Sequence, residues 1–152
     1  MINESIFKAY DVRGIYPSDL NDEIAKSVGQ AFTVKTKAKK IAVGRDGRLS
    51  SEALFKAVVS GITSQGADVY DIGLSTTECL YFSVGFYDDI DAGVMITASH
   101  NPKEYGGIKM VKKEGGAVTI LRGIDLLEAV KQEMSVSSSV GNIEKKDIWA
   151  DY

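Results

Sequence analysis

Short apolar runs alternate along this chain with stretches of helical periodicity, and this alternation limits the possible folds more than any other feature. Alternation of this kind is typical of strand–helix–strand units. The runs expected to form buried strands are KIAVG at 40–44, ADVYDIG at 67–73, IDAGVMIT at 90–97 and GIKMV at 107–111. The sequence therefore predicts an α/β protein, a three-layer α/β/α sandwich around a mixed, mostly parallel, four-stranded sheet.

Between these runs, apolar residues recur at the three- and four-residue spacing of amphipathic helices. The expected helices cover 18–35, 51–66, 76–87 and 121–134. Ser18 or Asn21 is suited to cap the first helix, and Ser50 or Ser51 is suited to cap the second. The stretch 7–16 mixes apolar and charged residues, so we expect a loop and a short edge strand there.

Composition excludes several classes of protein. The chain has 152 residues, 44% of them hydrophobic, which fits one globular domain with a real core. A formal net charge of −3 argues against nucleic acid or a membrane surface as partner. The start of the chain lacks the basic and apolar regions of a signal peptide, and one cysteine excludes an internal disulfide framework. We therefore expect a cytoplasmic protein. One histidine and one cysteine also cannot form a structural zinc site.

The last part of the chain differs in composition from the rest. After Met134 the sequence becomes rich in serine, as is typical of a linker, and it ends in KKDIWADY with apolar residues that lack an obvious core. We therefore expect one domain over 1–134, followed by a linker and the start of a second domain over 135–152.

Two polar turns follow strands of the predicted sheet, GRDGRLS at 44–50 and TASHNP at 97–102. In open α/β sheets, ligands bind at the carboxyl ends of the strands. Ser99 lies just past a strand end, in a turn able to present several backbone N–H groups as an anion nest. If the strand at 107–111 pairs with the one before the turn, Lys109 returns beside it. A serine near a fixed ammonium is suited to carry or pass a phosphoryl group, whose charge needs cations.

Plainer interpretations of the same residues stay open at this point. TASHNP consists of good turn formers, and on these residues alone a merely polar turn is the simpler interpretation. His100, the one histidine, is suited to acid–base work or to donating a hydrogen bond to a phosphate, but also to ordering the loop. Its position next to Ser99 does not by itself create a Ser-His-Asp arrangement.

Three segments in the same order resemble the α-D-phosphohexomutases, the phosphoglucomutase/phosphomannomutase group. TASHNPKEYGGIKM at 97–110 resembles the phosphoserine loop of that family. FKAYDVRG at 7–14 and VGRDGRLSS at 43–51 are similar to two further segments of its N-terminal domain, domain I. The resemblance covers nearly the whole chain and implies a parent enzyme that interconverts hexose 1-phosphate and hexose 6-phosphate through a bisphosphate.

The resemblance implies roles for individual residues. Ser99 matches the serine that carries the phosphoryl group, and its phosphoryl oxygen matches a ligand of the catalytic Mg²⁺. Lys109 matches a lysine that does acid–base work near the reacting hydroxyl. Tyr10 and Arg13 match residues that face the substrate and the phosphoserine.

Other matched positions have supporting roles in the family. His100 and Asn101 match loop positions that shape the site. Arg45, Asp46 and Arg48 match the second segment, which we interpret as an ionic scaffold that holds the loops.

The chain also departs from the family pattern. Enzymes of the family have four domains, and their second domain carries an aspartate-rich D-x-D-x-D-R metal loop that this chain lacks; DDID at 88–91 has the wrong spacing. GLSTTECL at 73–80 also lacks the family's proline-containing turn. The expected protein is therefore a fragment without useful mutase turnover, whose partners are a phosphosugar and the other domains of a parent chain. The expected activator is a hexose 1,6-bisphosphate.

Three other functions remain open on the sequence alone. One is a stand-alone module that binds a phosphosugar at Ser99 without chemistry. Another is an interaction domain that docks its apolar tail on a partner. A hydrolase is the weakest of the three, because it needs a base beside Ser99 and the adjacent His100 is badly placed for that role. The preferred sugar, the oligomeric state and the phosphorylation state of Ser99 do not follow from the sequence.

Overall fold

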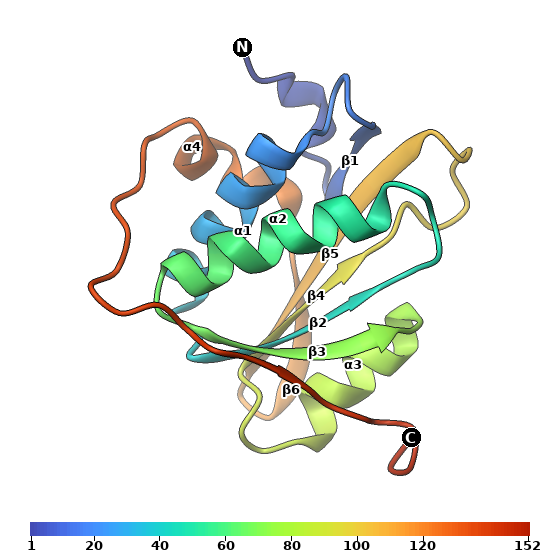
Figure 1. The fold of residues 1–152 in the computed structure, drawn as a ribbon, viewed down its shortest axis with the longest axis vertical. Helices are drawn as coiled ribbons and strands as arrows, with labels where there is room; N and C mark the ends of the chain where they lie inside the picture. The colour runs from blue at the N-terminus through green and yellow to red at the C-terminus, as the bar shows by residue number, and fades with distance from the viewer.

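The computed structural model describes all residues, 1–152, and centres on one seven-stranded sheet (Figure 1). The strand order is β1-β5-β4-β2-β3-β7, and β6 pairs with β5 off this path. The strands are β1 (Asp11–Ile15), β2 (Lys40–Arg45), β3 (Asp68–Leu74), β4 (Ala92–Ile96), β5 (Tyr105–Glu114), β6 (Ala117–Leu121) and β7 (Ile143–Lys145). The helices are α1 (Asp22–Thr36), α2 (Ser51–Ser64), α3 (Thr77–Phe86) and α4 (Leu127–Val130), with 3₁₀ turns at Glu4–Ile6 and Gly123–Leu126.

Helices cover both faces of the sheet. Helices α1, α2 and α4 lie on one face and α3 on the other (Figure 1). The larger core, with Phe32, Leu54 and Ile41 among its members, fills the side of α1 and α2. A smaller core that includes Leu80 and Met95 fills the side of α3. Helices α1, α2 and α3 each bury apolar residues in these cores, so the predicted three-layer α/β/α class is confirmed.

The number of strands is seven, so the prediction of four was wrong. Strands β4, β2, β3 and β7 run parallel, whereas β5 is antiparallel to β1, β4 and β6. The sheet is thus mixed, with as many antiparallel as parallel pairings. One missed strand, β6, follows a tight turn in which Gly115 and Gly116 both have positive φ, 58° and 80°. Paired glycines between two strands are a hairpin signal, and EGGA was not interpreted that way.

The closing helix expected over 121–134 is much shorter. Leu121 ends β6, and regular helix is limited to a 3₁₀ turn and the single turn of α4. A Cβ at Gly123 would lie 2.1 Å from the carbonyl oxygen of Asp11, so the chain packs there backbone against backbone. This close approach places Gly123–Leu126 against β1 and leaves little length for a helix.

Capping was predicted correctly for α1, whereas for α2 only the position of the N-cap residue was predicted correctly. The Asn21 side chain accepts a hydrogen bond from the Ile24 N–H at 2.9 Å, as expected for an N-cap. Ser50 occupies the N-cap position of α2 but makes no capping hydrogen bond, and the Ser51 hydroxyl donates to Asp46 instead. The α2 N-terminus is therefore tied to the loop that precedes it rather than capped by its own serine.

Residues 135–152 lie along the domain rather than away from it. Strand β7 pairs in parallel with β3, as the chain segment beside β3 in Figure 1 shows. Ile148 is completely buried in the smaller core, whereas Trp149 and Tyr152 stay more than half exposed. The domain boundary at Met134 remains a prediction, although one apolar residue of the tail, Ile148, is buried in the smaller core. None of the helices is long and apolar enough to cross a membrane.

Candidate active site

Ser99 lies in the loop that follows β4, at the carboxyl end of the parallel part of the sheet. Every residue of β4 is buried, so the strand is fixed and its end is a defined position. The loop after β2 reaches the same place, because the Asp46 N–H donates to the Ile96 carbonyl at 3.0 Å. The two polar turns singled out in the sequence therefore meet at one edge of the sheet, as the carboxyl-end rule predicts.

The Ser99 loop has an unusual backbone. Ser99 has a φ of 55°, in the left-handed region that non-glycine residues rarely adopt, and its side chain is exposed. Its N–H donates to the Thr97 hydroxyl at 3.0 Å, and the Asn101 N–H donates to the Ala98 carbonyl at 3.1 Å. The His100 N–H between them has no acceptor within the chain, so of these three consecutive N–H groups only one is free for the expected nest. The Ser99 hydroxyl lies 3.5 Å from Nδ1 of His100.

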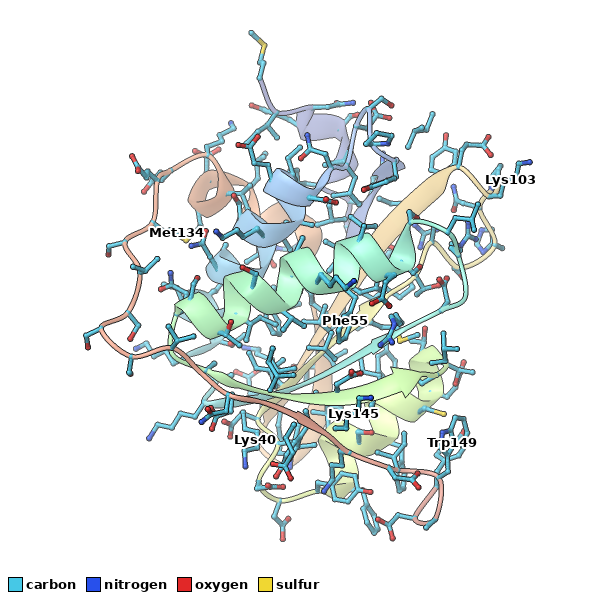
Figure 2. All side chains as sticks on the ribbon, in the orientation of Figure 1. Lys40, Phe55, Lys103, Met134, Lys145 and Trp149 are labelled. Atoms are coloured by element: carbon cyan, nitrogen blue, oxygen red, sulfur yellow. The ribbon has the colours of Figure 1, made fainter.

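Arg48 holds this loop through its carbonyl groups. Its guanidinium donates to the carbonyl oxygens of Ser99 at 2.8 Å, Asn101 at 2.7 Å, Pro102 at 2.7 Å and Tyr105 at 3.3 Å. Asp46 orients the guanidinium through Nε at 3.2 Å. One planar fork with five donors thus fixes the main chain from Ser99 to Tyr105, a task that an ammonium cannot perform. Lys103 extends from the tip of the same loop (Figure 2).

Arg45 does not join this group. Its guanidinium pairs with Glu52 at 2.9 Å and Asp71 at 3.2 Å, and it stacks 4.4 Å from the ring centre of Phe55, which Figure 2 labels between α2 and the sheet. These contacts link β2, β3 and α2. Of the three residues assigned to the scaffold, Arg48 bonds the serine loop directly, Asp46 supports it through Arg48, and Arg45 bonds neither.

Arg13 and Lys109 come together on a third residue, Asp11. Asp11 and Lys109 are direct partners in the antiparallel pairing of β1 with β5. Oδ2 of Asp11 accepts from Lys109 Nζ at 3.3 Å and from Nη2 of Arg13. Arg13 also donates through Nη1 to the Asn101 side chain at 2.6 Å. The two basic residues predicted for the site are therefore side by side and linked to the serine loop.

Sequence reasoning missed Asp11, although it lies inside the quoted segment FKAYDVRG. Asp11 is 4% exposed, and a buried carboxylate requires partners. Its alternation with Arg13 was the available signal, since residues two apart share a face of a strand. Tyr10, just before β1, is 70% exposed and available to a ligand.

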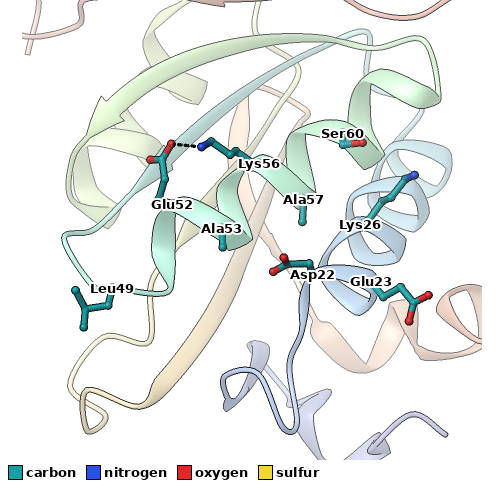
Figure 3. A pocket seen from close by; sticks show the side chains of 9 residues that line it. All are labelled: Asp22, Glu23, Lys26, Leu49, Glu52, Ala53, Lys56, Ala57 and Ser60. Atoms are coloured by element: carbon teal, nitrogen blue, oxygen red, sulfur yellow. Dashed lines mark ion pairs between the residues drawn. The ribbon is translucent and has the colours of Figure 1, made fainter.

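A hollow of about 390 Å³ opens beside Ser99 and His100. Thr76 and Glu78, at the N-terminal end of α3, also line this hollow. A hydrogen bond from its own backbone N–H, and then one from the Thr76 hydroxyl, lower the pKa of the Glu78 carboxyl. This acid is therefore held ionised at the positive end of the helix. A larger hollow of about 690 Å³ between α1 and α2 (Figure 3) is lined by neither Ser99 nor its contacts, so it is not the candidate site.

The fold and this loop together define a three-layer α/β/α domain with a serine-centred polar site at the carboxyl edge of its sheet. The family model described as phosphoglucomutase/phosphomannomutase, alpha/beta/alpha domain I, matches residues 4–134. The chain belongs to this family, as the resemblance implied.

Proteins similar to this chain in sequence are named phosphomannomutase or phosphoglucomutase. The chain is 41% identical over 133 residues to a phosphomannomutase of Klebsiella pneumoniae, with 88% of this chain and 84% of that protein covered. It is 39% identical over 156 residues to a phosphoglucomutase of Neisseria gonorrhoeae, covering 99% of this chain but 33% of that protein. A phosphomannomutase of Salmonella montevideo is 46% identical over 113 residues, covering 74% of this chain and 25% of that protein.

Solved structures agree. A phosphoglucomutase/phosphomannomutase family protein of Burkholderia thailandensis matches with a TM-score of 0.83 at 33% identity, over all of this chain and 35% of that one. The chain thus spans a quarter to about a third of the length of these longer relatives.

Proposed function

We propose that this chain is the phosphoserine-bearing domain of a mutase that interconverts hexose 1-phosphate and hexose 6-phosphate. The observation that carries the proposal is the placement of Ser99. Its hydroxyl is exposed on a loop whose main chain is clamped by Arg48, and Asn101, in the same loop, is bonded to Arg13. Phosphoryl transfer depends on positioning and charge neutralisation more than on covalent assistance, and this arrangement offers both.

In the proposed reaction, the phosphoryl group on Ser99 passes to a free hydroxyl of the hexose phosphate. The bond between phosphorus and the serine oxygen breaks as a bond to the sugar oxygen forms, and the sugar hydroxyl loses its proton. Lys109 takes part in passing that proton to the serine oxygen that is set free, and Arg13 neutralises phosphoryl charge. The resulting bisphosphate then returns its other phosphoryl group to Ser99. This return regenerates the phosphoserine and explains why a hexose 1,6-bisphosphate would act as activator.

The remaining loop residues act on the substrate rather than on the phosphoryl group. Tyr10 and Asn101 contact the sugar phosphate, and His100 donates a hydrogen bond or a proton beside Ser99. Asp46 and Arg48 hold the loop in place. In this proposal the supporting role of Arg45 is more remote, since it braces β2 against β3 and α2.

In this proposal Ser99 is the one residue of the chain that binds Mg²⁺, because its phosphoryl oxygen would be one ligand of the ion. No group of three histidine, cysteine, aspartate or glutamate side chains in this chain could hold a metal ion. The residues of this chain therefore do not form a Mg²⁺ site by themselves. The other ligands, most sugar contacts and useful turnover would come from further domains of a parent chain. The cytoplasmic location belongs to the same proposal.

The direct test is the mass of the chain isolated from its source cells, with and without Ser99→Ala. A wild-type chain heavier by one phosphoryl group, with the modification lost in the variant, supports the proposal. A phosphosugar-binding module without chemistry would instead keep its affinity in Ser99→Ala and carry no phosphate. Turnover of hexose 1-phosphate above background by this chain alone, with glucose 1,6-bisphosphate and Mg²⁺, would contradict the proposed dependence on other domains.

A further inference from the structure

We propose that Asp11 is a positioning residue that holds Arg13 and Lys109 in place and competes with the phosphoryl group for both. This inference rests on the proposed function of Ser99 and adds a residue to which the matched motifs assign no role. The inference is based on the two hydrogen bonds that one carboxylate oxygen of Asp11 accepts. Oδ2 of Asp11 accepts hydrogen bonds from both Lys109 Nζ and Arg13 Nη2.

Because the two cations are mostly buried, they require an anion between them. The side chains of Asp11, Arg13 and Lys109 are only 6%, 16% and 21% exposed. Two like charges held this close and this far from water repel one another unless an anion lies between them. Strand register puts the anion there, because Asp11 faces Lys109 directly across the β1–β5 pairing and Arg13 follows two residues later on the same face.

The group also connects to the serine loop. Arg13 Nη1 donates to Asn101 at 2.6 Å, two residues beyond Ser99. Nε of Arg13 is buried and has no partner within the chain. The guanidinium therefore uses one nitrogen on Asp11 and another on the loop and keeps a third N–H unused. Rotation of this side chain would break the link between β1 and the loop.

The net charge of Asp11, Arg13 and Lys109 determines how tightly this group binds phosphate. One acid and two bases leave a net charge of +1 beside a phosphoryl group that carries −1.5 to −2. Without the acid, both cations are free to contact the phosphoryl group, and binding of phosphate becomes tighter. A mutase must pass the group in both directions, and a phosphate held too strongly in the ground state transfers slowly. Asp11 thus limits phosphate affinity and keeps the cations where transfer needs them.

The experiment uses the chain with its four arginines labelled with ¹⁵N, whose guanidinium Nη–H signals are few enough to assign. In Asp11→Asn the Arg13 signal should exchange with water at least about tenfold faster, because its charged partner is gone. Titration of a uniformly ¹⁵N-labelled sample with inorganic phosphate, followed at the backbone amides of Ser99 and His100, should show binding about threefold tighter or more. Asp71→Asn is the matched control. It neutralises another mostly buried carboxylate paired with an arginine and should alter the Arg45 signal only.

A purely structural role predicts the opposite for phosphate. If Asp11→Asn binds phosphate equally or more weakly, or leaves the Arg13 signal unchanged, the proposal is wrong. Should Asp11→Asn not fold, the double variant Asp11→Asn with Lys109→Met restores the charge count. It should still show fast Arg13 exchange, and an unchanged Arg13 signal there also rejects the proposal. These readouts need no phosphoryl transfer, so they decide the role of Asp11 even if Ser99 is never phosphorylated and the proposed function fails.

Discussion

Nη2 of Arg48 lies 2.8 Å from the carbonyl oxygen of Ser99, and this contact joins the loop after β2 to the loop after β4. The same nitrogen reaches the carbonyl of Asn101 at 2.7 Å. The conformation of the serine loop is therefore set by a side chain 51 residues earlier in the sequence. Several measurable consequences depend on this and similar long-range contacts.

Replacing Arg48 by lysine should loosen the serine loop although the charge is kept. An ammonium cannot reach four carbonyls from one plane, and the loss of charged hydrogen bonds should lower the free energy of unfolding by about 1.5–3 kcal/mol. Urea denaturation measures the loss, and hydrogen exchange over 97–105 should rise. Arg122→Lys is the control, because Arg122 is 59% exposed and should change stability by less than about 0.5 kcal/mol. Equal effects of the two substitutions would refute the clamp.

The positive φ of Ser99 predicts an order of stability among its variants. Ser99→Gly removes the Cβ that makes a φ of 55° costly, whereas Ser99→Ala keeps it. The glycine variant should be more stable than the alanine variant by about 0.5–1 kcal/mol, even after the greater chain entropy of glycine is counted. Denaturation of the unphosphorylated variants at one pH provides the comparison. A glycine variant less stable than the alanine variant would show that Ser99 is not strained.

Ile148 should contribute to the stability of the domain although it lies in the tail. It is completely buried in the smaller core, so Ile148→Ala should cost about 2–5 kcal/mol. Ile143→Ala is the matched control, since Ile143 is 58% exposed and its loss should cost well under about 1 kcal/mol. Denaturation midpoints measure both. If Ile148→Ala is as mild as the control, residues 135–152 are a linker in solution and the boundary at Met134 holds.

Tyr87 should make stability depend on alkaline pH. Burial and a hydrogen bond donated to Asp151 at 2.6 Å raise the pKa of Tyr87 from its ordinary value of 10.0 to about 12. A pKa raised in the folded state means that the folded protein keeps this proton longer than the unfolded chain does. The stabilisation is therefore complete below pH 10 and is lost as the pH rises toward 12.

The measurement compares wild type with Tyr87→Phe by denaturation at several values of pH. Their difference in unfolding free energy should be constant up to about pH 9 and should shrink above pH 10, because only the wild type has this hydroxyl to ionise. A difference that stays constant up to pH 12 would show that Tyr87 and Asp151 are not paired in solution.

Local patterns in the sequence were sufficient for much of the fold and for most of the site. The helical spacing in α1 and α2, the Asn21 cap and the buried runs of β2, β3 and β4 depend on neighbours within a few residues, so they could be predicted. The motif around Ser99 also lies within one short stretch, and its resemblance to the phosphohexomutases identified the family that comparison then confirmed. Three strands were not among the predicted four. Strand β6 follows the Gly115–Gly116 turn, whose hairpin chemistry was overlooked, β1 lies where a short edge strand was expected, and β7 lies in the segment interpreted as a linker.

The tertiary structure decided which charges meet. Asp11 and Lys109 are 98 residues apart, and only the register between β1 and β5 makes them partners. A shift of that register by one residue would send Lys109 to the opposite face of the sheet. Likewise Arg45 and Arg48 look equivalent in the motif, but they contact different elements of the fold. The sequence by itself determined most of the elements and the position of the motif around Ser99, because those depend on short-range physics. Strand pairing determined the charged group around the serine, because burial brings together residues that no local pattern connects.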